Sequence, residues 1–126
     1  MTDALPVDRL LRMFLEQARE HAVMLVDRDG QIRWSNPAAN RIFGRDVAGQ
    51  ALAVLFTPED VAMGMPAYEI STATAHGVAE DDRWLVRNDG SRFWASGLMI
   101  AVRDEQGELL AFGKILRNRT DLWEQM

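Results

Sequence analysis

The chain has 126 residues, of which 48% are hydrophobic and 26% are charged. This composition supplies enough apolar surface for one globular domain and excludes disordered and collagen-like chains. Lys and Arg number 14 against 19 Asp and Glu, which gives a net charge of −5. An acidic balance opposes attraction to phosphate backbones and to anionic lipid. We therefore expect neither a nucleic acid nor a membrane as a partner.

Cysteine is absent, and the histidines are His21 and His76 alone. The lack of thiols excludes disulfides, cysteine nucleophiles and thiolate metal sites, and two histidines are one short of a three-histidine metal site. The sequence has no apolar run of membrane-spanning length, and its N-terminus lacks the basic region of a signal peptide. We expect a cytoplasmic protein that holds no metal.

The first half of the chain predicts a helix, a hairpin and a second helix. Residues 7–20 carry an apolar stripe at helical spacing, with charged residues around the other face. Two strand-like runs, 22–26 and 31–35, flank Asp29-Gly30, which is a strong hairpin signal. Asn36-Pro37 predicts a helix start and Gly44 its end. Residues 46–56 are ambiguous between coil and a turn or two of helix.

The second half predicts two helical pieces and then three strands. Thr57-Pro58 followed by two carboxylates indicates a helix N-terminus. Pro66 is expected to interrupt that helix, with a second piece running from about residue 67 to His76. Runs 83–87, 92–103 and 108–117 alternate as strands and predict an antiparallel meander. A further helix is expected from Thr120.

Three strings in this order resemble the PAS domain family over about residues 21–121. They are LVDRDG at 25–30 with WSNPAA at 34–39, then AEDDRWLVRNDGSRFWA at 79–95, and GKILRNRT at 113–120. The middle string is similar to a bacterial sensory-box subgroup that lies ahead of sensor histidine kinases and related outputs. Any one string is weak evidence, whereas three in the expected order and spacing are strong evidence.

The resemblance implies an α+β PAS fold with a five-stranded antiparallel sheet in the order 2-1-5-4-3. Short helices are expected on one face of the sheet, with a flanking N-terminal amphipathic helix. The implied organisation is a cap or dimerisation helix over 1–20, the PAS domain over 21–119 and the start of a C-terminal linker helix over 120–126. The partners this implies are a second copy of the chain and a downstream effector domain such as a histidine kinase.

Alternation along residues 92–103 separates two faces of one strand. The resemblance assigns one face to a ligand pocket, where Ala95 and Gly97 are expected to leave room. The pocket candidates are Phe43, Leu55, Tyr68, Phe93, Ala95, Gly97, Met99 and Ile115. The other face is expected to meet the N-terminal helix or a second subunit. The dimer-interface candidates are Leu10, Leu11, Phe14, Leu15, Trp94, Leu98 and Ile100.

The cofactor is unknown from the sequence, and we expect none to be obligatory. A covalent flavin photoadduct is excluded because the chain has no cysteine. Non-covalent FAD remains an alternative, since Trp84 lies near, though several residues beyond, the place of a tryptophan in redox-sensing flavin relatives. Haem is disfavoured because His76 falls too late in its helix and His21 precedes the first strand.

Catalysis has little support, and we predict that the chain is not an enzyme. No nucleophile pairs with a base and no phosphate loop is present. Glu80-Asp81-Asp82 is a carboxylate cluster, which we interpret as a solvated acidic loop. The family couples its sheet to the outgoing helix through an Asp-hydrophobic-Thr element, and Asn118-Arg119-Thr120 stands there. Asn118 keeps hydrogen-bonding capacity without charge, and Thr120 can cap the helix.

Two functions remain open. The first is a sensory domain that binds a small ligand or cofactor in the pocket and relays the change through dimerising terminal helices. The second is an interaction module whose interior is filled by its own side chains. The deciding feature is whether the pocket candidates close the space opened by Ala95 and Gly97.

Overall fold

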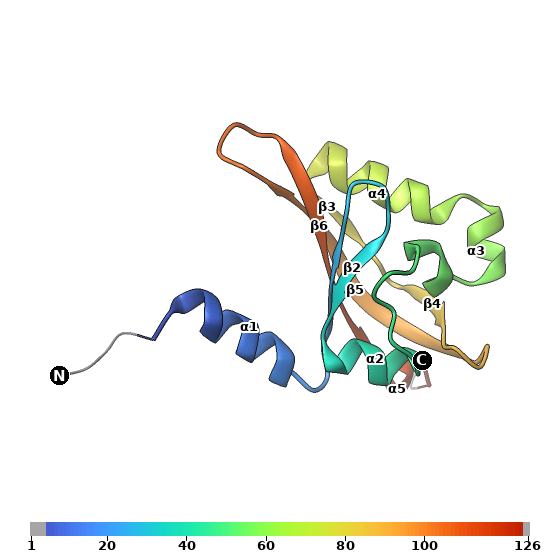
Figure 1. The fold of residues 1–126 in the computed structure, drawn as a ribbon. Helices are drawn as coiled ribbons and strands as arrows, with labels where there is room; N and C mark the ends of the chain where they lie inside the picture. Colours follow the sequence, from blue (N-terminus) through green and yellow to red (C-terminus); the bar gives the residue numbers. More distant parts are fainter. Residues whose placement is uncertain (1–4, 125–126) are drawn as a thin grey trace.

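One antiparallel sheet organises the chain, and the computed structural model describes residues 5–124 (Figure 1). The ends of the two predicted terminal segments, residues 1–4 and 125–126, lie outside the described residues. In chain order the elements are α1 (Val7–Gln17), β1 (Ala22–Val26), β2 (Ile32–Ser35), α2 (Pro37–Phe43), the 3₁₀ helix η1 (Leu52–Leu55), α3 (Pro58–Ala62), α4 (Met65–His76), β3 (Val78–Glu80), β4 (Arg83–Val86), β5 (Arg92–Arg103), β6 (Leu109–Asn118) and α5 (Thr120–Glu124).

The sheet has six strands where the sequence predicts five. Its order is β2-β1-β6-β5-β3, and β4 also pairs with β5. Glu80 faces Leu98 and Arg83 faces Ala95, so β3 and β4 keep one register along the same edge of β5. They therefore fill a single position, and the predicted order 2-1-5-4-3 is confirmed with its third strand interrupted after Glu80.

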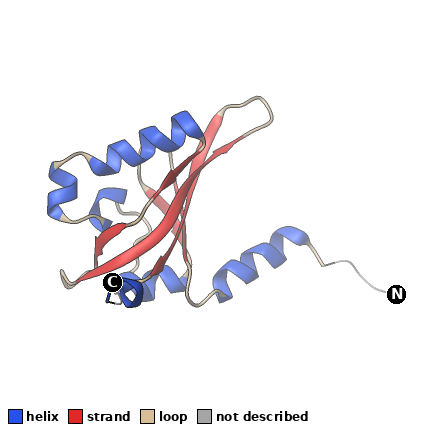
Figure 2. Cartoon of the chain, turned by 180° about the vertical axis from the view of Figure 1, so that it is seen from behind, coloured by secondary structure: helices blue, strands red, loops and turns tan. Residues whose placement is uncertain are grey.

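Helices cover one face of this sheet, which we call the inner face (Figure 2). On β5 the residues Phe93, Ala95 and Met99 are fully buried against this layer, whereas Leu98 and Ile100 on the outer face are exposed. The expected separation of the two faces is confirmed. The helix α1 extends away from the body of the domain instead of covering the sheet (Figure 1). Across residues 5–124, no helix has the length and apolarity needed to cross a membrane.

Helix boundaries follow local chemistry. The helix α2 begins after Asn36 and ends at Gly44, which has a left-handed backbone with φ of 75°, as the sequence predicts. Pro66 does not interrupt a helix as expected. It lies in the first turn of α4, where proline is tolerated, because the break comes earlier at Gly64 with φ of 78°. The N-terminal helix ends at Gln17, three residues before the predicted end.

Asn36 ties three elements together. Its side-chain oxygen accepts hydrogen bonds from the backbone N–H of Val23 and Ala39, and its amide nitrogen donates to the carbonyl oxygens of Leu15 and His21. The residue is fully buried. Replacing it removes a helix cap and leaves buried backbone groups without partners.

We expect Asn36→Ala to lower the free energy of unfolding by about 2–3 kcal/mol, measured by urea denaturation. Asn88→Ala is the matched control, because Asn88 is exposed in a turn, and its loss should change stability far less. Equal effects of the two substitutions would show that the Asn36 contacts do not hold these elements together.

Candidate functional site

Five of the predicted pocket residues are buried between the inner face of the sheet and the helices that cover it. Phe43 and Phe93 meet edge to face with ring centroids 5.4 Å apart. Leu55, Ala95 and Met99 are fully buried in the same apolar cluster. The structure therefore brings these five candidates together as members of one buried core.

Two other pocket candidates lie elsewhere. Ile115 pairs with Leu98 on the outer face, because its neighbour Lys114 occupies the inner-face position of β6. The one-residue offset reverses the predicted orientation of Ile115. Tyr68 lies on α4 and is 62% exposed, so its side chain points to solvent instead of into the interior.

Gly97 does not provide the room expected of it. A β-carbon placed there would lie 2.2 Å from the carbonyl oxygen of Ile115 and 2.7 Å from the β-carbon of Leu116. The backbones of β5 and β6 therefore approach so closely at this point that only glycine fits. The space opened by the missing side chain is already filled by the neighbouring strand.

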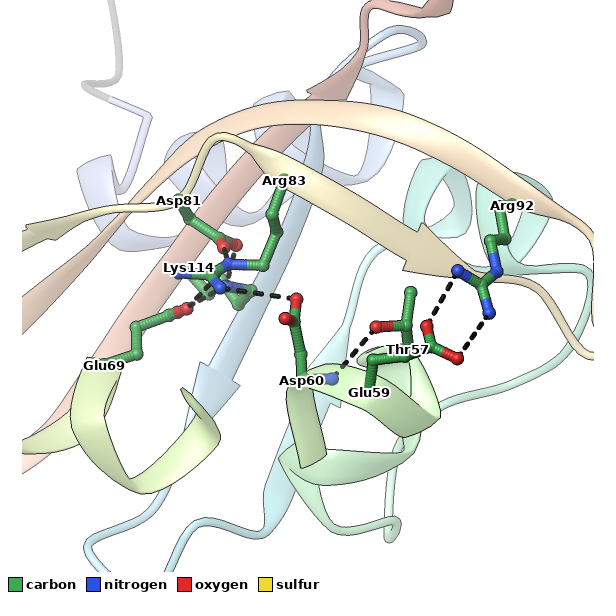
Figure 3. Close-up of polar contacts among 8 residues, drawn as sticks. All are labelled: Thr57, Glu59, Asp60, Glu69, Asp81, Arg83, Arg92 and Lys114. Atoms are coloured by element: carbon green, nitrogen blue, oxygen red, sulfur yellow. Dashed lines mark hydrogen bonds and ion pairs between the residues drawn. The ribbon is translucent and has the colours of Figure 1, made fainter. Parts of the chain in front are cut away.

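A cluster of buried charges lies beneath the inner face, and we call Lys114, Glu69, Asp81 and Arg83 the ion cluster (Figure 3). The Lys114 ammonium on β6 donates to Glu69 Oε1 on α4 at 2.5 Å and also to Asp81 Oδ2. Arg83 Nε on β4 donates to Asp81 Oδ1 at 2.5 Å. The side chains of Lys114, Glu69 and Asp81 are inaccessible to solvent. One cation thus holds two carboxylates inside the domain.

Arg83 extends the ion cluster toward the surface. Its guanidinium lies 3.6 Å from Asp60 Oδ2 on α3 and 3.9 Å from Glu69 Oε2. Glu69 Oε2 is buried and makes no hydrogen bond. The ring of Phe56 lies beneath both cations, with its centroid 5.3 Å from the Arg83 guanidinium carbon and 5.7 Å from Lys114 Nζ.

The pKa values of the two buried carboxyl groups, Glu69 and Asp81, are shifted in opposite directions. Burial raises the pKa of Glu69 to about 7, an effect that Lys114 opposes and the neighbouring negative charge of Asp81 reinforces. Burial also acts to raise the pKa of Asp81, but Lys114 and Arg83 together outweigh it and lower that pKa below its usual value. Such opposed environments make Glu69 the member of the cluster that changes charge near neutral pH.

The outer face of the sheet is largely open and apolar. Leu25, Leu98 and Ile100 are exposed there. Beside them, a groove of about 390 Å³ runs between α1 and this face, lined by Asp8, Leu11, Arg12, Leu15, Leu25 and Trp34. Of the interface candidates on α1, Leu11 and Leu15 line this groove. Leu10 and Phe14 are exposed beside it on the same helix, and Phe14 is 71% accessible.

Trp94, the remaining interface candidate, is covered by the chain's own C-terminal helix. Trp123 of α5 stacks on Trp94 with centroids 5.1 Å apart and meets Trp84 of β4 edge to face at 5.2 Å. Trp84 and Trp94 are themselves in edge-to-face contact at 5.5 Å. We call these three residues the tryptophan cluster.

Asn118 and Thr120 anchor α5 to β5. Asn118 Oδ1 accepts hydrogen bonds from the backbone N–H and the hydroxyl of Thr120, at 3.0 and 2.6 Å. Thr120 Oγ1 in turn accepts from the backbone N–H of Trp94 at 3.1 Å. The Asn118 side chain therefore takes the capping contact expected of Thr120, while Thr120 binds the sheet.

Residues 20–121 match the sequence profile of a family described as the PAS domain. The chain belongs to the PAS domain family. It is 28% identical over 113 residues to Two-component system protein A of Emericella nidulans, a match that covers 87% of this chain and 16% of that relative. This PAS domain therefore spans a small part of the curated signalling protein that it matches.

Solved PAS domains share the fold. The PAS domain of a protein from Colwellia psychrerythraea matches with a TM-score of 0.83 at 18% identity, over 92% of this chain and 99% of that one. A domain of the sensory box sensor histidine kinase/response regulator from Geobacter sulfurreducens matches with a TM-score of 0.71 at 17% identity, over 89% and 94% of the two chains. The predicted PAS fold is confirmed, and the chain is a PAS domain of the kind found in signalling proteins.

The sequence interpretation of Asp81 was wrong, because this residue is buried and is not part of a solvated acidic loop. Asp81 continues the alternation of β3 and β4 with Ala79, Arg83 and Leu85, and its N–H donates to the Gly97 carbonyl oxygen at 2.9 Å. Period-two alternation across the acidic run was the available signal. The two histidines that the sequence disfavours as haem ligands are both exposed, His76 at the end of α4 and His21 before β1.

The raised pKa of Glu69 predicts a pH dependence of stability. Between its ordinary value of 4.5 and about 7, the folded PAS domain binds more protons than the unfolded chain, so stability falls as pH rises through this window and levels off above it. We expect the stability of Glu69→Gln relative to the unmodified domain to rise across the same window, measured by urea unfolding at a series of pH values.

The control for this titration is Glu59→Gln. Glu59 is exposed, and its hydrogen bond from Arg92 lowers its pKa, although burial acts weakly against this. The contribution of Glu59 to the free energy of unfolding therefore changes with pH below 4.5 and is constant above it. If the difference in unfolding free energy between Glu69→Gln and the unmodified domain stays constant from pH 4.5 to 7, the pKa of Glu69 is not raised.

Proposed function

We propose that this PAS domain is an interaction and relay module of a signal-transduction protein, which self-associates through α1 and the outer face of its sheet. The observation that carries the proposal is the number of exposed apolar side chains on α1 and on the outer face of β1 and β5, together with the groove between α1 and the β1–β2 edge. Soluble monomers seldom expose apolar patches of this kind without a partner.

A second copy of the chain is the occupant that suits this surface. The surface consists of a protruding helix and an open sheet face. In a dimer with twofold symmetry, α1 of each copy would pack against the outer face of the other copy. Asp8 and Glu16 balance Arg9 and Arg12 on α1, and two such helices meet without net charge repulsion despite the overall charge of −5.

The packed interior supports the interaction module over the ligand sensor. Phe43, Leu55, Phe93 and Met99 fill the region between sheet and helices, and β6 occupies the space beside Gly97. The relay would then pass from the dimer interface through the sheet to α5, which is bound to β5 and β4 through the tryptophan cluster. A kinase or similar effector domain would receive it, as in signalling proteins that contain such domains.

Size-exclusion chromatography with light scattering tests the self-association. We expect a dimer at tens of micromolar, and a monomer for Phe14→Glu and for Ile100→Glu. Gln17→Glu is the matched control, because it adds the same charge to an exposed polar position of α1 and should leave the dimer intact. A monomeric unmodified chain, or a dimer that survives both apolar-to-Glu substitutions, would refute the proposal.

A further inference from the structure

We propose that the edge strand β4 couples the ion cluster to α5, so that uptake of a proton by Glu69 in the interior loosens the docking of α5 on the outer face. The coupling runs within one chain, through Arg83 on one side of β4 and Trp84 on the other. It goes beyond the proposed self-association and does not require it.

The first step lies in the ion cluster. Three carboxylates surround the Arg83 guanidinium, namely Asp81 at 2.5 Å, Asp60 at 3.6 Å and Glu69 at 3.9 Å. When Glu69 is ionised it attracts Arg83 toward α4. Protonation removes that attraction and leaves Arg83 held by the other two groups, so the force on β4 depends on the charge of Glu69.

In the described part of the chain, the charged groups around Glu69 come from β6, from β4 and the segment before it, and from α3. Lys114 approaches from β6, Asp81 from the segment between β3 and β4, and Arg83 from β4, while Asp60 of α3 acts through Arg83. Burial acts on the pKa of Glu69 most strongly, and Lys114 and Asp81 act in opposite directions. The proton therefore goes on and off Glu69 near neutral pH, while Asp81, whose pKa is lowered, stays ionised.

The second step lies in β4. Successive strand residues point to opposite faces, so Arg83 reaches the ion cluster while Trp84 reaches the tryptophan cluster. The strand is four residues long, and within residues 5–124 it pairs only with β5, apart from one bridge between Leu85 and Phe56. A short edge strand with so few partners can shift when the pull on Arg83 changes.

The third step lies in α5. This five-residue helix has no buried residue of its own. It is held by the contacts of Trp123 with Trp84 and Trp94 and by the hydrogen bonds of Asn118 and Thr120. A displacement of Trp84 breaks its contact with Trp123. The helix α5 then keeps the Trp94 contact and the hydrogen bonds of Asn118 and Thr120, and it is bound less firmly.

Tryptophan fluorescence tests the coupling in a Trp34→Phe background, where the remaining indoles are those of the tryptophan cluster. We expect the emission to shift to longer wavelength as pH falls from 8.5 to 5.5, with a midpoint close to the pKa of Glu69, about 7. Glu69→Gln should abolish the shift. Glu59→Gln, which alters an exposed carboxylate on α3, should leave both the shift and its midpoint unchanged.

A second readout requires no substitution in the ion cluster. In the same background with ¹³C-labelled Glu and ¹⁵N-labelled Trp, the side-chain carboxyl resonance of Glu69 and the indole N–H resonance of Trp123 should titrate with one midpoint. Separate midpoints, an indole signal that does not move, or a shift retained in Glu69→Gln would overturn the coupling. Because each signal arises within one chain, loss of the dimer in Phe14→Glu should leave the titration in place.

Discussion

Replacing Lys114 by methionine is expected to lower the free energy of unfolding by about 3–5 kcal/mol at pH 8. The substitution keeps a long apolar side chain at an inner-face position of β6 but removes the cation shared by Glu69 and Asp81, both inaccessible to solvent. Two carboxylates would then remain buried with Arg83 as their nearest cation. Urea unfolding followed by circular dichroism measures the change.

Two comparisons separate this effect from a general loss of packing. Arg92→Met breaks an exposed ion pair with Glu59 at 2.8 Å and should leave the unfolding midpoint nearly unchanged, because exposed pairs add little to stability. Adding Glu69→Gln and Asp81→Asn to Lys114→Met removes the orphaned charges and should recover part of the lost stability. If Lys114→Met is as stable as the unmodified domain, the Lys114 contacts in the ion cluster do not contribute to the free energy of unfolding.

Gly97→Ala is expected to destabilise the domain by about 3 kcal/mol or more, at the upper end of overpacking effects. The added methyl group would lie 2.2 Å from the Ile115 carbonyl oxygen. A backbone atom in the middle of a central strand cannot move aside without disturbing the pairing of β5 with β6. The unfolding midpoint in urea and the melting temperature should both fall.

Gly113→Ala is the control for this substitution. Gly113 is also a mid-strand glycine, on β6, but a β-carbon there would meet nothing within 4 Å. Since alanine restricts the unfolded chain more than glycine, we expect Gly113→Ala to be neutral or to stabilise by about 0.5 kcal/mol. Similar losses at both positions would mean that glycine is required for a reason other than the close approach of the strands.

Local signals predicted most of the fold because their chemistry acts over a few residues. The cap at Asn36, the left-handed Gly44 and the alternation of β5 each depend on near neighbours, and the structure confirms them. The strand β3 was missed because its three residues form a strand only through their long-range pairing with β5. Pro66 was misjudged for a local reason, because the chain already breaks at Gly64, two residues earlier, and Pro66 falls in the first turn of the next helix.

The candidate site was harder to predict, because it depends on which distant residues meet. Alternation correctly placed Phe93 and Met99 on the inner face, yet alternation cannot tell a hollow from a packed core. Lys114 lies between the buried Phe112 and Leu116 on the same face of β6, and that spacing was a signal. Its pairing with Glu69, 45 residues away in sequence, is a tertiary contact that no local pattern contains.

Native mass spectrometry of the purified chain tests the central claim most directly, because one spectrum reports both association and bound molecules. We expect a species of twice 14.2 kDa with no additional mass, which Phe14→Glu converts to the single-chain mass. A single-chain mass for the unmodified protein would contradict self-association through α1. A retained extra mass, such as that of FAD, haem or another small molecule, would contradict an interior filled by its own side chains.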